Sequence, residues 1–210
     1  MPTKFPHAIV ALLILAACKF ASAVSPLPTT DLTPATLTES DISIVDVSLA
    51  AEAGKRYLAG TVIDSPMATL CAILQDYPAY PRFMPNTDKV EIVKVDGKQT
   101  VLDMTLKLPL GKVKRYRLSM SSAIDNNACR LSWVMVARAD LAASETIADT
   151  VGSWKLTPLP GNAQKTRVQY FVYSDPGPVP LGLGWIVDAL GKESLPKTLE
   201  ALRSRAKPKP

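Results

Sequence analysis

Apolar and polar residues alternate through most of the chain between residues 55 and 173. The alternation is most regular in residues 100–108, where four even positions are apolar: Leu102, Met104, Leu106 and Leu108. A side-chain period of two is the repeat of a β-strand with one buried face. Similar runs predict further strands at residues 42–45, 55–63, 89–95, 113–124, 130–138, 144–156 and 166–173.

Short turn sequences separate the central runs. Asp96 and Gly97 form a hairpin signal, and Asn126 and Asn127 separate two later strands. Strands joined by tight turns pair with their neighbours in antiparallel fashion. The sequence therefore predicts an antiparallel meander with one buried face.

Two parts of the chain follow the helical period instead. Apolar residues in residues 67–74 recur at the spacing i, i+3, i+4 and i+7, and a short second helix or turn is expected at residues 80–85. A long helical run ends at Arg203, after a proline-rich elbow at residues 174–180. Strands that are followed by a long helix indicate an α+β fold.

The final helix has two apolar faces that point in different directions. Trp185, Ile186 and Leu190 share one face, and Leu195, Leu199 and Leu202 share the other. Gly191 and Pro196 separate them, so we expect a bend. The second half would anchor in the core, and the first half would form a wall or gate.

The N-terminus resembles an export signal. Residues 8–17 are uninterruptedly apolar, which is too short to cross a bilayer and is typical of a secretory signal. The signal peptide would span residues 1–23 and end at a small-residue cleavage site, or span residues 1–17 and leave Cys18 as a lipid-attachment residue. Residues 24–40 are expected to be a flexible linker. We expect a periplasmic protein, and membrane anchoring through Cys18 stays open.

Histidine and cysteine usage limits the chemistry. His7 is the only histidine and lies inside the predicted signal, so the processed protein would lack histidine general bases and most zinc sites. The carboxylates are scattered, so no catalytic residue, metal ligand or cofactor site is predicted. Cys71 and Cys129 both have apolar neighbours, and we expect two buried free thiols rather than a disulfide.

The net charge of +5 carries little information about partners. No run of Lys and Arg is present, and no basic patch is interleaved with aromatic residues. The sequence therefore predicts no nucleic-acid binding. Attraction to an anionic membrane surface remains open.

Large rings and thioethers gather on the apolar faces of the predicted strands. Any one of them taken alone is more commonly a core residue than a ligand contact, because most apolar residues simply pack. As a set they indicate a cavity, because a strongly bent sheet and one helix leave space between them. The predicted ligand-binding residues are Tyr116, Met120, Trp133, Met135, Trp154 and Tyr170 in the strands, and Trp185, Ile186 and Leu190 in the final helix.

Several segments together resemble the START-like, or polyketide cyclase, superfamily of helix-grip proteins (SRPBCC). Residues 74–85 (LQDYPAYPRFMP) are similar to a characteristic segment of that family. The other similar segments are residues 61–66, 152–158, 166–170 and 175–180. The resemblance implies a domain at residues 41–206, followed by a tail at residues 207–210.

The resemblance also implies a fold and a ligand class. The fold is a curved seven-stranded antiparallel sheet around a long C-terminal helix, with two short helices after the first strand. The ligands are lipids, sterols, isoprenoid quinones or polyketides. We expect an exported, non-catalytic binder or carrier of a hydrophobic small molecule. The alternatives are a cyclase-like enzyme with a buried carboxylate and tyrosine, and an interaction module with a solid core that acts through residues 179–185.

Overall fold

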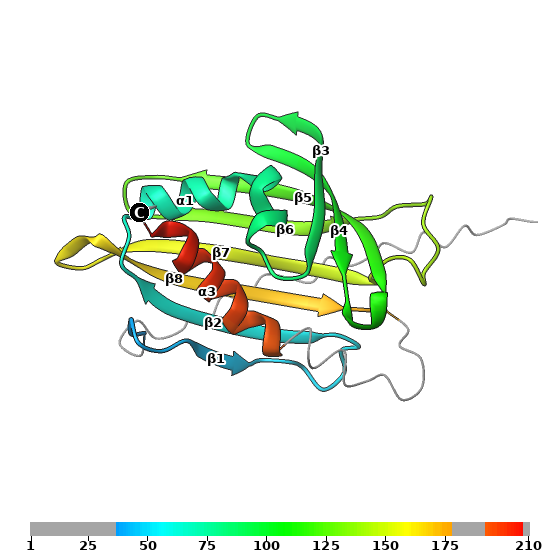
Figure 1. Cartoon of the computed structure of the whole chain (residues 1–210), viewed down its shortest axis with the longest axis horizontal. Coiled ribbons are helices and arrows are strands. Elements are labelled where there is room, and N and C mark those ends of the chain that lie inside the picture. The colour runs from blue at the N-terminus through cyan, green and yellow to red at the C-terminus, as the bar shows by residue number, and fades with distance from the viewer. Residues whose placement is uncertain (1–36, 178–191, 208–210) are drawn as a thin grey trace, which may run out of the picture.

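The structure is a computed structural model that describes residues 37–177 and 192–207. Eight antiparallel strands form one curved sheet in the order β1-β2-β8-β7-β6-β5-β4-β3 (Figure 1). The strands are β1 (Ser43–Asp46), β2 (Lys55–Ile63), β3 (Thr87–Asp96), β4 (Gln99–Lys107), β5 (Val113–Ile124), β6 (Cys129–Val136), β7 (Asp149–Leu159) and β8 (Asn162–Asp175).

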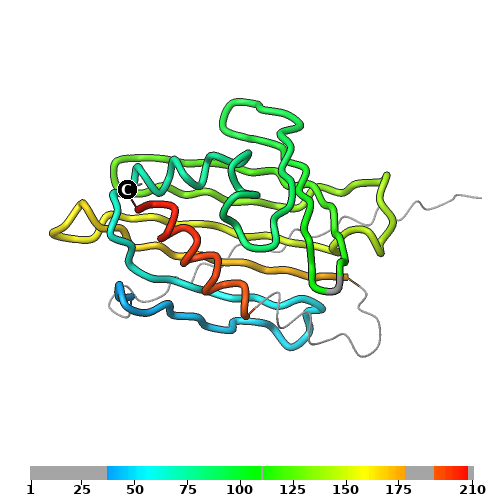
Figure 2. Tube along the Cα trace, viewed as in Figure 1, coloured from blue at the N-terminus to red at the C-terminus, as the bar shows by residue number. Residues whose placement is uncertain are grey.

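The helices lie together on one face of this sheet, as the trace in Figure 2 shows. They are α1 (Met67–Gln75), the 3-10 helix η2 (Tyr77–Arg82) and α3 (Ser194–Ala206); a further 3-10 turn, η3 (Pro109–Gly111), joins β4 to β5. This confirms the predicted α+β helix-grip architecture. We call the helix-covered face of the sheet the inner face.

The alternation in the sequence sorts side chains between the two faces. In β4, Leu102 and Met104 are buried on the inner face, whereas Asp103 lies on the outer face. There Asp103 accepts two hydrogen bonds from Arg117, whose Nε and Nη2 atoms lie 2.7 and 2.9 Å from the carboxylate oxygens. The inner face is therefore apolar because each strand contributes every second side chain to it.

The final helix packs on this inner face through the three leucines that the sequence places on one side. Leu195, Leu199 and Leu202 are almost completely buried. Near the end of α3, the Arg203 guanidinium donates a 2.7 Å hydrogen bond to Thr61 in β2. The first half of the predicted helix, with its bend at Gly191, lies outside the described residues.

Three details of the expected fold are wrong. The sheet has eight strands rather than seven, because the short β1 adds an edge by pairing with β2 from Ser43↔Gly60 to Asp46↔Tyr57. For the same reason, the helix α1 and the 3-10 helix η2 follow the second strand rather than the first. The run at residues 144–156 also becomes a strand only at Asp149, where pairing with β8 begins.

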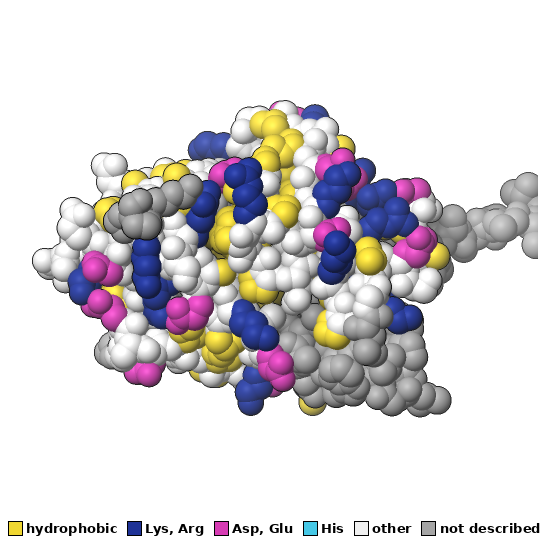
Figure 3. Space-filling model, in the orientation of Figure 1, with side chains coloured by type: hydrophobic (Ala, Val, Ile, Leu, Met, Phe, Trp, Pro, Cys, Tyr) yellow, Lys and Arg dark blue, Asp and Glu magenta, His cyan; other side chains and the backbone are white. Residues whose placement is uncertain are grey.

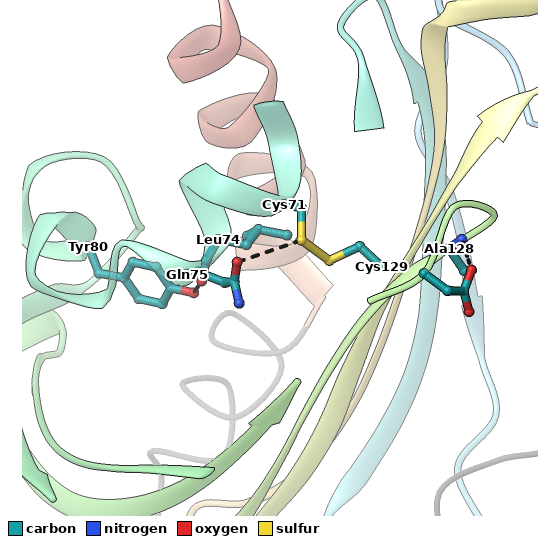
Figure 4. Close-up of a disulfide and its surroundings, with 7 residues drawn as sticks. Cys71, Leu74, Gln75, Tyr80, Ala128 and Cys129 are labelled. Carbon is teal, nitrogen blue, oxygen red and sulfur yellow. Dashed lines mark hydrogen bonds between the residues drawn. A yellow bond between two sulfur atoms is a disulfide. The ribbon is translucent and has the colours of Figure 1, made fainter. Parts of the chain in front are cut away.

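The prediction of two free thiols is wrong as well. Cys71 of α1 and Cys129 of β6 form a disulfide, with their Cα atoms 6.2 Å apart (Figure 4). Both cysteines are buried, as their apolar neighbours suggested. The packing of α1 across the sheet brings together two residues separated by 58 positions, and no local pattern reports that contact. The disulfide fixes α1 over the end of the sheet where β6 begins.

Candidate ligand-binding cavity

A cavity of about 260 Å³ lies between the inner face of the sheet and α3. Strands β2 to β8 contribute to its lining, together with η2, the segment before β3 and the first turns of α3. Most of these side chains are apolar, among them Leu102, Met104 and Leu118. A concave, mostly apolar chamber with a few polar groups is typical of small-molecule sites.

Five of the predicted ligand-binding residues line this cavity: Tyr116, Met120, Trp133, Trp154 and Tyr170. Met135 does not line the cavity. It lies on the inner face, but its side chain packs against the hydrophobic core. Trp185, Ile186, Leu190 and Cys18 lie outside the described residues. Ligand contact by any of these residues stays a prediction.

Three aromatic rings form one wall of the cavity. The ring centroids of Trp154 and Tyr170 are 4.3 Å apart, and those of Trp133 and Tyr170 are 5.7 Å apart. Aromatic pairs at these separations stabilise one another beyond the area that they bury. The indole Nε1 of Trp133 also lies 3.4 Å from the hydroxyl of Thr150, which itself donates to the carbonyl of Tyr173 at 2.8 Å. These contacts fix the wall.

Gly152 makes room for this arrangement. It lies opposite Trp133 in the ladder between β6 and β7. A Cβ atom on Gly152 would lie 2.1 Å from the Trp133 ring and 2.6 Å from the carbonyl oxygen of Phe171. Only glycine therefore allows the indole to approach the backbone of β7 so closely.

The tyrosine hydroxyls in the cavity differ in their partners. Tyr80 donates a 2.6 Å hydrogen bond to the carbonyl of Leu74, which ties η2 to the end of α1 (Figure 4). Tyr116 and Tyr170 have no hydrogen-bond partner within the described part of the chain. Burial raises the pKa of both, so the hydroxyls stay neutral at physiological pH. They are available to a polar group of a ligand.

One end of the cavity is polar, and the sequence analysis did not identify its residues. We call it the lysine end and define it by Lys55, Lys114, Thr150 and Ser174, all of which line the cavity. Lys55 pairs with Ser174 across β2 and β8, and Ser174 pairs with Thr150 across β8 and β7. The alternation in β5 contained the signal for Lys114, which lies two residues before Tyr116 on the same face.

None of the described residues that line the cavity is Asp or Glu. The pKa of Asp149 is raised, chiefly by burial and also by the nearby Asp175. However, Asp149 precedes the cavity-lining Thr150 in β7, so its side chain points to the opposite face. Within residues 37–177 and 192–207, no cluster of His, Cys, Asp and Glu is arranged to hold a metal ion.

On the surface, basic and acidic side chains are intermixed over the face seen in Figure 3. Several outer-face cations are paired, including Arg115 with Glu145 at 2.6 Å and Arg138 with Asp103 at 3.1 Å. None of the helices in the described ranges is both long and apolar enough to cross a membrane.

A family model described as polyketide cyclase / dehydrase and lipid transport matches residues 63–203. The chain belongs to this family. The match extends from the end of β2 to α3 and so includes most of the strands and helices that enclose the cavity. A comparison with curated protein sequences found no significant match.

Solved structures of START-like proteins and of an aromatase/cyclase share the fold of this chain. A STAR-related lipid transfer protein from Xanthomonas axonopodis aligns with a TM-score of 0.66 at 17% identity, covering 79% of this chain and 93% of that one. Human StAR-related lipid transfer protein 5 gives 0.67 at 12% identity, covering 79% and 81%. The Zhui aromatase/cyclase from a Streptomyces species gives 0.58 at 14% identity, covering 79% and 94%. At these identities the similarity shows the fold alone.

Proposed function

We propose that this protein is an exported, non-catalytic binder or carrier of a lipid or another hydrophobic small molecule. The observation that carries the proposal is the cavity of about 260 Å³, which is lined mainly by apolar and aromatic side chains between the sheet and α3. Burial of a ligand there would be favoured by about 25 cal/mol per Å² of apolar surface. A neutral tyrosine hydroxyl, such as that of Tyr116, would orient a polar group of the ligand.

The arrangement of the acidic residues favours binding over catalysis. A cyclase-like reaction with a buried carboxylate needs that group inside the cavity, and the described acidic residue whose pKa burial raises, Asp149, faces away from it. An interaction module would not need the internal space next to α3. The proposal of a carrier accounts for both features.

Two features support export. Residues 8–17 have the length and composition of a secretory signal. The disulfide between Cys71 and Cys129 is of a kind that persists in oxidising compartments and is rare in the cytosol. The mass of the intact protein from periplasmic and membrane fractions tests this part of the proposal. A start at Val24 indicates free export, and a lipidated Cys18 indicates an anchored form. A protein that retains residues 1–17 in the cytosol would contradict export.

The binding function is tested by filling the cavity. Met120 lines the cavity, and its neighbour Ser121 lies on the other face of β5, so Met120→Trp and Ser121→Trp form a matched pair. We expect the wild type and Ser121→Trp to bind the neutral fluorophore N-phenyl-1-naphthylamine and to release a hydrophobic compound on solvent extraction. We expect Met120→Trp to lose at least tenfold in fluorophore affinity while keeping a cooperative unfolding transition. Failure of the wild type to bind the fluorophore would overturn the proposal.

A further inference from the structure

Lys114 extends the inner face of β5 to the lysine end of the cavity. Four inner residues of this strand line the cavity in succession: Lys114, Tyr116, Leu118 and Met120. A ligand that lies along β5 would therefore contact apolar and aromatic groups over most of its length and an ammonium group at one end. The cavity is amphipathic along this strand.

Lys114 is not neutralised by a carboxylate. Its ammonium group donates a 2.6 Å hydrogen bond to the carbonyl of Thr146 and forms no ion pair with any described residue. By contrast, the outer-face arginines of the same strand are both paired, Arg115 with Glu145 and Arg117 with Asp103. The cation on the cavity side is thus the one that β5 leaves without a counter-charge.

Partial burial of this cation has a physical cost. Removal from water lowers the pKa of Lys114, because burial disfavours the charged form and no described anion offsets it. An anion placed beside the ammonium group would relieve that cost and raise the pKa again. Of its three N–H donors, one is used by Thr146, which leaves two for a ligand.

The groups around Lys114 also favour an anion. Lys55 is a second cation in the lining, although it also contacts Asp46 electrostatically. Lys55 is the first residue of β2 and Lys114 is the second residue of β5, so both lie at the end of the sheet where β8 finishes. Thr150 and Ser174 add hydroxyl groups at this end, and no described carboxylate lines the cavity there.

From this arrangement we infer that the ligand is an amphiphile with an anionic headgroup, a carboxylate or a phosphate. The headgroup binds at the lysine end beside Lys114, and the apolar chain extends towards Met120 and the wall formed by Trp133, Trp154 and Tyr170. Lys114 is a specificity-determining residue that discriminates anionic amphiphiles from neutral ones of the same length. This inference rests on the proposed binding function and narrows its ligand class.

The test uses single-chain amphiphiles that differ only in their headgroups. Dodecanoate, monododecyl phosphate and 1-dodecanol compete with bound N-phenyl-1-naphthylamine at pH 7.5, below their micelle concentrations. The variant Lys114→Gln removes the charge but keeps a donor for the Thr146 carbonyl, and Lys114→Arg keeps the charge. Lys112→Gln is the matched control, because Lys112 is exposed two residues away and does not line the cavity.

We expect the wild type to bind at least one of the two anions at least tenfold more tightly than 1-dodecanol. Lys114→Gln should weaken binding of that anion about tenfold and leave 1-dodecanol unchanged, while Lys114→Arg and Lys112→Gln stay close to the wild type. The tighter of the two anions identifies the headgroup. Equal losses for the anions and the alcohol, or equal effects of the two glutamine variants, would overturn the inference. If the wild type fails to bind even the neutral fluorophore, the proposed function fails first.

Discussion

The disulfide between Cys71 and Cys129 makes the sharpest prediction about stability. Reduction leaves both sulfur atoms in place and removes only the covalent constraint between α1 and β6. The bond joins residues separated by 58 positions. On chain entropy alone, a loop of that length is worth about 4 kcal/mol at 25 °C, within the roughly 2–5 kcal/mol that loss of a native disulfide costs.

Urea unfolding followed by tryptophan fluorescence measures this effect, because Trp133 and Trp154 are buried in the cavity wall. With a denaturant slope of about 2 kcal/mol per M, a loss of 4 kcal/mol moves the midpoint by about 2 M. The wild type is compared with and without reductant. The control is Cys71→Ala/Cys129→Ala, whose unfolding should be insensitive to reductant.

Two results would refute this reasoning. The first is a thiol titration that finds two reactive cysteines in unfolded protein that has never been exposed to reductant. The second is a midpoint that moves by less than about 0.3 M when the wild type is reduced, which corresponds to less than 1 kcal/mol. In that case α1 would be held by packing alone, through residues such as Leu70 and Leu74, which are completely buried.

Three other variants test the packing and the electrostatics. Gly152→Ala places a methyl group against Trp133, and urea titration should show a loss of about 1–3 kcal/mol; an unchanged midpoint would contradict the close contact. Leu199→Ala empties a buried site under α3 and should cost about 2–5 kcal/mol in the same assay. Asp103→Asn should cost about 1 kcal/mol at pH 7, where the carboxylate is paired. Hydrogen bonds from Arg117 lower the pKa of Asp103 below its ordinary 3.8, so this stabilisation is lost as the pH falls through the lowered value. Melting temperatures of the variant and the wild type should converge in that acidic range, and a constant difference would contradict the assignment.

The strands were predictable because their signal is local. A run such as residues 100–108 alternates within itself, and the observed strand β4 (Gln99–Lys107) differs from it by a single residue at each end. The disulfide was not predictable in this way. It depends on the angle at which α1 crosses the sheet, and the hydrophobic stripe of α1 indicates only that Cys71 faces inward.

The cavity lining was predictable in part for a related reason. Alternation assigns a side chain to a face, and it identified Tyr116, Trp133 and Tyr170 correctly as members of the inner face. It does not say which inner residues lie beside open space: Met120 is buried and lines the cavity, whereas Met135 on the same face is partly buried against the core and does not line it. Lys114 was overlooked because a lysine at the beginning of a strand normally points into solvent. Its place on the same face as Tyr116 was the one local signal that it lines the cavity.

The disulfide and the lysine end of the cavity should act independently. The disulfide fixes α1 over the sheet near the beginning of β6 and does not line the cavity, whereas Lys114 lines the cavity near the beginning of β5. β5 and β6 are antiparallel neighbours, and Cys129 pairs with Ile124, at the far end of β5 from Lys114. Ten residues of extended strand separate Lys114 from Ile124, a distance of roughly 33 Å. Free-energy changes at such separations add. Reduction should therefore lower the stability of the wild type and of Lys114→Gln equally, and Lys114→Gln should reduce the preference for anionic amphiphiles by the same factor with the disulfide intact or reduced. If the preference for anionic amphiphiles disappears on reduction, α1 helps to position the headgroup. The disulfide and the lysine end would then not be independent.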